Sequence, residues 1–288
     1  MFSRTACLLF YFISACSVYL RAEERWLDIT AEAGLDHHPT SRVKFANLNN
    51  DLWPDIVMQP ESGEGESPTI YLHSGTTDTV RYIRKTDTNL PSVYPGDTLV
   101  FADLDNDGNQ DAILGRYLDI YQDNYQPPAS PPDRSVWLPG RGDGSFGEPR
   151  IFADAQLATT RAIAVGDVNV DGLPDLYLGN WYEKYFTGYE AFSNDLLLQF
   201  RVKGAMPGFV RWPMPLETAT TSFDTDLGGR PTYGAALPRL DDGIPMLLEL
   251  SYGRRWNRLY QMKLREPLRI PPGSEAPAPL ELRDNRAA

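Results

Sequence analysis

Acidic and amide side chains recur at a fixed spacing in this chain, and they are the residues best suited to chemistry. From Asp103 to Asp111 the sequence reads Asp-Leu-Asp-Asn-Asp-Gly-Asn-Gln-Asp, with carboxylates at loop positions 1, 3, 5 and 9. Together with the main-chain carbonyl at position 7, they supply the roughly six to eight oxygen ligands that Ca²⁺ prefers, and the glycine at position 6 permits a sharp turn. Mg²⁺ fits this set less well, because it retains its waters and requires stricter geometry. The loop therefore predicts a calcium site.

The same pattern occurs in three segments that align without gaps, at residues 45–55, 101–111 and 165–175. The third loop has asparagine at position 3, and the first has asparagine at positions 1 and 3. In the first loop Leu52 replaces the turn glycine, and holding a leucine at φ > 0 costs roughly 1 kcal/mol. We therefore predict two calcium sites and a weaker third. The predicted ligands are Asp103, Asp105, Asp107, Asn109 (carbonyl) and Asp111 in the second loop; Asp167, Asn169, Asp171, Leu173 (carbonyl) and Asp175 in the third; and Asn47, Asn49, Asp51, Trp53 (carbonyl) and Asp55 in the first.

Two other structures share parts of this pattern. An EF-hand requires a glutamate at position 12 and an exiting helix. Leu114 and Leu178 occupy position 12 here, inside apolar, strand-like runs, so the EF-hand is excluded. Hairpin turns that bind no ion remain the alternative, because Asp and Asn also stabilise turns through their own side chains.

Short apolar strands must position these loops. Apolar runs follow the three loops at residues 56–58, 112–114 and 176–178, and further apolar or aromatic segments precede the next loop. A degenerate fourth copy at 237–246 has lost the ligands. Each repeat is typical of a four-stranded antiparallel unit, which buries both faces only by stacking on its neighbours. We expect an all-β fold: a β-propeller-like array of about four four-stranded blades.

The two ends of the chain bear on whether this array closes. The expected domain spans residues 23–272 and is followed by a disordered tail at 273–288. Residues 26–29 (Trp-Leu-Asp-Ile) resemble an outer strand without inner strands of its own, whereas the last repeat already has an outer strand near 268–270. We therefore expect an incomplete arc, truncated or completed by another chain. Its apolar flanks would favour self-association or a complementary chain.

Composition and charge restrict the partners. The 288-residue chain has 27 Lys+Arg and 39 Asp+Glu, a formal net charge of −12, and 42% hydrophobic residues. This apolar content is sufficient for a folded core, and 23 glycines and 24 prolines predict many short elements joined by turns. An acidic surface argues against nucleic acid, because a phosphate backbone requires a basic surface.

The first 22 residues have the charged start and the short apolar run of a secretory signal peptide. They predict a secreted, periplasmic or cell-surface protein. Cleavage after Ala22 is one expectation, and a lipobox ending at Cys16, which would make a lipid anchor the only membrane contact, is the other. Because Cys7 and Cys16 are the only cysteines, the mature chain is expected to contain no disulfide.

Two insertions rich in aromatic residues follow the second strand of the second and third repeats. In a four-stranded blade this connection lies at the end opposite the acidic loops, so neighbouring blades would place these rings side by side. Loop packing and a recognition platform for a protein or a glycan are the two interpretations, since Tyr and Trp are favoured in recognition surfaces. The candidate ligand-binding residues are Tyr117, Tyr121, Trp181, Tyr182 and Tyr185.

With these repeats, the chain resembles the FG-GAP/VCBS repeat proteins, whose blades build integrin-α-like β-propellers. Its opening from Trp26 to Leu35 resembles ASPIC/UnbV-type proteins. The resemblance implies an exported, calcium-binding scaffold for adhesion or for protein or carbohydrate interaction, without a catalytic role. Such propellers commonly have more blades than the four repeats counted here, and no UnbV-like domain is recognised after them. An extracytoplasmic carbohydrate-active enzyme, or its accessory subunit, is the alternative, because some polysaccharide lyases carry calcium-bearing propellers.

Overall fold

The computed structural model describes most of the chain that follows the predicted signal peptide. The described residues are 26–35, 40–60, 66–76, 79–93, 96–117, 134–156, 159–181, 192–212, 231–239, 243, 245–252, 257–264 and 280–284. The predicted signal peptide with Cys16 lies outside these ranges, as do Tyr121, Tyr182 and Tyr185. Among the described residues, none forms a helix long and apolar enough to cross a membrane.

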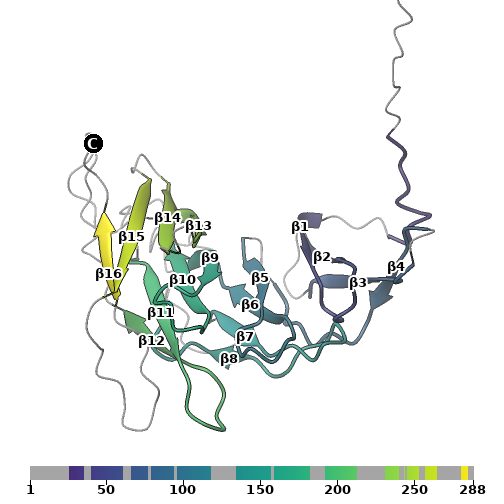
Figure 1. The fold of residues 1–288 in the computed structure, drawn as a ribbon. Helices are drawn as coiled ribbons and strands as arrows, with labels where there is room; N and C mark the ends of the chain where they lie inside the picture. The colour runs from purple at the N-terminus through teal and green to yellow at the C-terminus, as the bar shows by residue number, and fades with distance from the viewer. Residues whose placement is uncertain are drawn as a thin grey trace, which may run out of the picture.

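All regular structure in the described residues is β-structure, arranged in four antiparallel sheets of four strands, each in chain order (Figure 1). The first sheet contains β1 (Thr40–Ala46), β2 (Asp55–Pro60), β3 (Thr69–His73) and β4 (Tyr82–Lys85), and the second contains β5 (Thr98–Ala102), β6 (Asp111–Gly115), β7 (Val136–Leu138) and β8 (Arg150–Ile151). The third contains β9 (Thr160–Gly166), β10 (Asp175–Asn180), β11 (Asp195–Phe200) and β12 (Gly208–Trp212), and the fourth contains β13 (Thr232–Ala236), β14 (Met246–Ser251), β15 (Arg258–Leu264) and β16 (Leu280–Asp284). The all-β class and the four four-stranded units are confirmed.

Each acidic loop joins the first strand of a sheet to the second. In the first three sheets, the position-9 aspartate opens the second strand and pairs with the last residue of the first strand. These pairs are Ala46 with Asp55, Ala102 with Asp111, and Gly166 with Asp175. The three loops are therefore held by the same strand pairing, so differences in their hydrogen bonding come from their own residues.

The middle sheets bury both faces, which explains their continuous apolar strands. In β6, Ala112 and Leu114 pack in one cluster with Val57 of the first sheet. Ile113 points to the opposite face and packs in a second cluster with Leu176 of the third sheet. Because successive strand side chains point to opposite faces, a strand covered on both sides must be apolar at every position.

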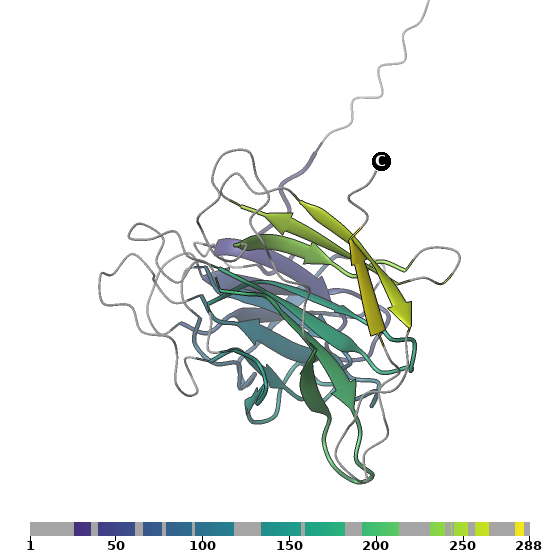
Figure 2. The ribbon, with the colours of Figure 1, turned by 90° about the vertical axis from the view of Figure 1, so that its left-hand side faces the viewer.

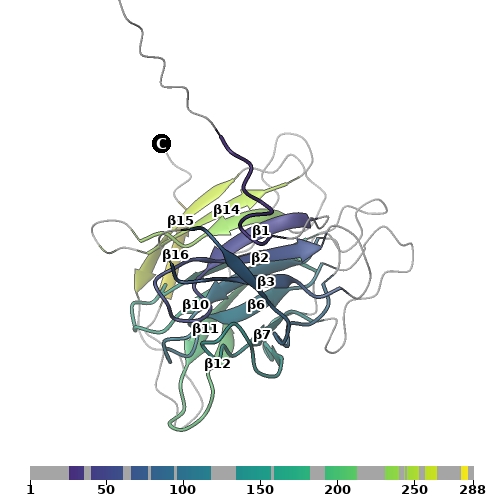
Figure 3. The same cartoon turned by 90° about the vertical axis from the view of Figure 1, so that its right-hand side faces the viewer.

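The four sheets follow one another in a curved row, from β1–β4 at one end to β13–β16 at the other (Figure 1). Seen from the two ends of this row, the fourth sheet lies in front in Figure 2 and the first sheet lies in front in Figure 3. A third apolar cluster, with Tyr177 and Leu196 on one side and Leu247 and Tyr260 on the other, joins the last two sheets. The core therefore lies between the sheets.

The two sheets at the ends of the row expose apolar side chains. On β1, Val43 and Phe45 are 49% and 65% exposed, and on β14 and β15, Leu250 and Leu259 are 40% and 41% exposed. In the middle sheets, a neighbouring sheet covers such positions. The end sheets thus have apolar surface that no other described sheet covers.

Two expectations about the chain ends are corrected. Residues 26–29 form no strand, and Trp26 is 93% exposed. The segment instead leads into a turn, in which the Ala33 nitrogen donates to the Ile29 carbonyl and the Ala33 carbonyl accepts from the Tyr82 nitrogen in β4. The predicted tail at 273–288 contains β16, which pairs with β15 along its whole length. Its backbone hydrogen bonds to β15 make it the outer strand of the fourth sheet, and residues 268–270, expected in that place, lie outside the described ranges.

Candidate metal centre

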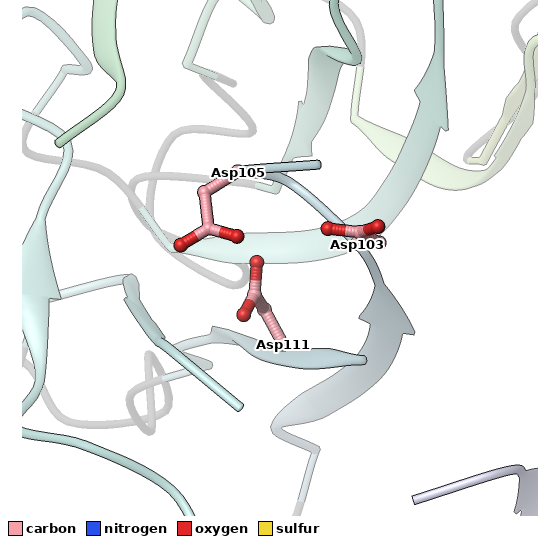
Figure 4. Close-up of side chains that lie close together, drawn as sticks. All are labelled: Asp103, Asp105 and Asp111. Carbon is pink, nitrogen blue, oxygen red and sulfur yellow. The ribbon is translucent and has the colours of Figure 1, made fainter. Parts of the chain in front are cut away.

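Three carboxylates of the second loop converge on one point. Asp103, Asp105 and Asp111 each offer an oxygen, and these oxygens lie within 4.8 Å of one another (Figure 4). Two oxygens bound to one Ca²⁺ at roughly 2.3–2.6 Å can be at most about 5 Å apart, so the spacing fits a single ion. Asp103 and Asp105 come from the loop, whereas Asp111 comes from the start of β6.

The position-9 aspartate anchors each loop to its sheet. Both Asp111 oxygens accept main-chain hydrogen bonds, Oδ2 from Leu104 at 2.8 Å and Oδ1 from Gly140 at 2.7 Å. The equivalent pairs of donors are Leu48 and His73 for Asp55, and Val168 and Gln199 for Asp175. Since each carboxylate oxygen has two lone pairs, these bonds position the side chain and still allow it to bind a cation.

Each loop turns at position 4, and the second and third loops also turn at position 6. Asn50, Asn106 and Val170, all at position 4, have φ values of 58°, 52° and 62°. The glycines at position 6 of the second and third loops also have positive φ, but Leu52 is not among the described residues with positive φ. The expectation that Leu52 would be strained is therefore wrong, because among the described residues of the first loop only Asn50 has positive φ.

The position-1 residue separates the first loop from the other two. In the second loop, the Asp103 oxygens accept hydrogen bonds from the main-chain nitrogens of Asp107 and Gly108, both at 3.0 Å. Asp167 accepts the two equivalent bonds in the third loop, also at 3.0 Å. The Asn47 amide instead donates to the Asp51 carbonyl. The first loop thus has an amide donor where the other two loops have a carboxylate that accepts.

The position-7 residues predicted to offer carbonyls share one local contact. The main-chain nitrogens of Trp53, Asn109 and Leu173 donate to the carboxylate at position 5 of the same loop, at 2.7, 2.8 and 2.9 Å. The position-3 side chain also binds the position-5 carboxylate in the first and third loops. The amides of Asn49 and Asn169 donate to its second oxygen at 2.9 Å. The first and third loops thus replace a carboxylate at position 3 with an internal hydrogen bond.

Burial and neighbouring charges raise the pKa of the carboxyl groups in these loops. Burial, followed by repulsion from Asp105 and Asp107, raises the pKa of Asp111 to about 7. The pKa of Asp105 is raised for the same reasons, burial first and Asp107 next. Burial also raises the pKa of Asp175 well above its ordinary value. A bound divalent cation would offset this repulsion and favour the carboxylate form.

Contacts between neighbouring loops were not predicted. The Asn50 amide donates to Asn109 Oδ1 at 2.6 Å, and the Asn106 amide donates to the Gly172 carbonyl at 3.3 Å. Arg239, from the degenerate fourth copy, lies 3.3 Å from Asp167 Oδ2. The sequence does show an asparagine at position 4 of both the first and second loops, which could have indicated a hydrogen bond to a neighbouring loop. The partner of that asparagine, however, depends on how the sheets pack.

The candidate aromatic residues lie at the opposite end of the strands. Tyr117 follows β6 and Trp181 follows β10, and their ring centroids are 6.2 Å apart. Trp181 is only 4% exposed. Tyr233 and Tyr252 of the fourth sheet, which sequence reasoning missed, lie 5.9 and 5.0 Å from the Trp181 ring.

Comparisons with known proteins do not assign the chain to a family. No family model matches the sequence, and no curated protein matches it.

Proposed function

We propose that this protein is an exported, calcium-binding scaffold of the FG-GAP/VCBS type, a β-propeller-like array that binds a protein or a glycan without catalysing a reaction. The observation that carries the proposal is the convergence of Asp103, Asp105 and Asp111 within 4.8 Å. The residues present fit Ca²⁺, because they offer hard oxygen ligands on a loop that the sheet holds in place. The signal-peptide-like first 22 residues support export.

Asp103, Asp105, Asp107 and Asp111 would hold the ion in the second loop, and Asp167, Asp171 and Asp175 in the third. A bound ion would supply charge neutralisation where the loops bring several carboxylates together. It would also tie the first strand of a sheet to the second, since ligands come from the loop and from the second strand. In this proposal the ion has a structural role.

The proposed blade array also explains why the two end sheets expose apolar side chains. Val43 and Phe45 at one end, and Leu250 and Leu259 at the other, remain exposed in a row of four sheets. Exposed apolar flanks of this kind favour association. We propose that a second copy or a complementary chain covers them.

Calcium removal tests the proposal. A ligand that binds only the folded state stabilises it by about 2.7 kcal/mol at a concentration of 100 times Kd. The melting temperature should therefore be higher in excess Ca²⁺ than in excess chelator, and Mg²⁺ should restore less of the difference. Asp143→Asn, which changes an exposed carboxylate outside the loops, is the control and should keep the full response. Identical melting curves in Ca²⁺ and chelator would refute the proposal.

A further inference from the structure

A cluster of arginine and aromatic side chains gathers residues from all four sheets at the end of the strands opposite the acidic loops. Some members lie near the start of a first strand, and others lie one or two residues after a second strand, whereas the acidic loops join the other ends of these strands. We call it the arginine–aromatic cluster. Its members are Arg42, Tyr117, Arg161, Trp181, Tyr233 and Tyr252.

The cluster is continuous. The Arg161 guanidinium carbon lies 5.3 Å from the Tyr117 ring centroid and 5.2 Å from that of Tyr233, so the cation sits between two aromatic rings. Tyr233 and Tyr252 are stacked with centroids 6.1 Å apart and an interplanar angle of 27°. These two rings are 56% and 40% exposed. The cluster thus presents two nearly parallel tyrosine rings to solvent, beside a guanidinium group.

The two arginines share a main-chain acceptor, and Arg42 also donates to the Asp97 carbonyl. Nη1 of Arg42 and Nη1 of Arg161 lie 3.3 and 2.6 Å from the Gly96 carbonyl oxygen. The nearby Asp97 carboxylate is bound by Arg116 at 2.7 Å and by the Tyr117 nitrogen at 2.6 Å. Burial and the charge of Arg161 lower the pKa of Arg42, whereas Tyr233 and the Asp97 carboxylate act in the opposite direction. Two like charges held this close would be stabilised by an anion.

Backbone irregularities place two members of the cluster. In β9, Thr160 pairs with Asn180 and Ala162 with Gly179, which leaves Arg161 between them as a bulged residue. In β13, Tyr233 is bulged in the same way. Bulges re-aim a side chain and are common next to binding sites. Arg161 and Tyr233 therefore occupy equivalent bulge positions in neighbouring sheets and contact each other.

We propose that the arginine–aromatic cluster binds an acidic glycan, with the anionic group on Arg42 and Arg161 and a sugar ring against Tyr233 and Tyr252. Guanidinium groups form charge-assisted hydrogen bonds with carboxylate and sulfate oxygens. The flat, exposed tyrosine pair suits the C–H face of a pyranose, and its hydroxyl groups add hydrogen-bonding capacity. These rings favour a glycan over an acidic peptide. The inference rests on the interaction role in the proposed function, but it does not depend on the calcium site.

The test is calorimetric titration of the full chain in Ca²⁺ with four probes. They are an oligogalacturonate, a sulfated oligosaccharide, a neutral oligosaccharide of matched length and a polyglutamate peptide. Binding of either charged sugar, with the neutral sugar at least about tenfold weaker, supports the proposal, and comparison of the two charged sugars identifies the anionic group. Stronger binding of polyglutamate would overturn the glycan assignment, and absence of binding to both charged sugars would overturn the site.

Variants locate the binding. Arg161→Gln and Tyr233→Ala should each weaken charged-sugar binding at least about tenfold. Arg150→Gln is the matched control, because Arg150 also lies over an aromatic ring, 5.9 Å from the Trp137 centroid, but outside the cluster. Unchanged binding in both cluster variants would overturn the proposal. Calcium-dependent melting, measured on the same samples, reports folding, so loss of sugar binding with calcium binding intact is distinguishable from failure of the proposed function.

Discussion

The second acidic loop carries four carboxylates and the first carries two, yet both join the first and second strands of a sheet in the same register. Both also anchor the position-9 aspartate through two main-chain hydrogen bonds and turn at a position-4 asparagine with positive φ. The loops differ at position 1, where Asp103 accepts hydrogen bonds from the loop and Asn47 donates to it. The two loops therefore share the turn at position 4 and the anchor at position 9, but they differ in their number of carboxylates and in the hydrogen bonds made at position 1.

The largest expected effect is the pH dependence of calcium binding by the second loop. The pKa of Asp111 is raised to about 7, so the folded, metal-free protein binds this proton more tightly than the unfolded chain does. The stability of the metal-free protein should accordingly fall as the pH rises from about 4 to about 7. Calcium requires the carboxylate, so the affinity of the second loop should fall about a hundredfold from about pH 8 to about pH 5.

Calcium titrations by calorimetry across this pH range, with melting curves in chelator as the reference, measure the effect. The reference is needed because other carboxyl groups also titrate in this range. An affinity that stays constant down to about pH 5 would remove Asp111 from the ligand set.

Substitution at position 3 tests the comparison directly. Asp105→Ala removes one of the three converging oxygens and should weaken calcium binding by at least about tenfold, or about 1.4 kcal/mol. Asn49→Ala, the same position in the first loop, should leave the calcium-dependent rise in melting temperature nearly unchanged. Equal losses in the two variants would contradict the distinction between the loops.

The third loop allows a smaller effect on stability to be tested. Val170 has φ 62°, a conformation that disfavours a β-branched residue, whereas the other two loops have asparagine there. Val170→Asn should stabilise the protein by about 1 kcal/mol, measured by urea unfolding. The reverse change, Asn106→Val, should destabilise it by at least as much, because it also removes the hydrogen bond to the Gly172 carbonyl. No gain from Val170→Asn would show that position 4 does not control the turn.

Much of the fold could be predicted because it repeats. Strands were predicted in the apolar runs that follow the second and third loops, at 112–114 and 176–178, and the structure has β6 and β10 there, each beginning at the position-9 aspartate. Prediction failed where the repeat was absent or altered. Trp26 and its neighbours resemble an outer strand but form none, and Leu52 stands at a turn-glycine position without adopting positive φ.

The sequence by itself determined the features that depend on short-range spacing. Within a nine-residue loop, the positions of Asp103, Asp105 and Asp111 limit how far apart their oxygens can be, so residue types and spacing are sufficient to predict that these carboxylates converge. Only the tertiary structure decided which loops touch and which side chains surround Arg161, because Tyr117 and Tyr233 come from different sheets. Their proximity results from the packing of apolar faces between sheets, and that packing depends on side chains far apart in the chain.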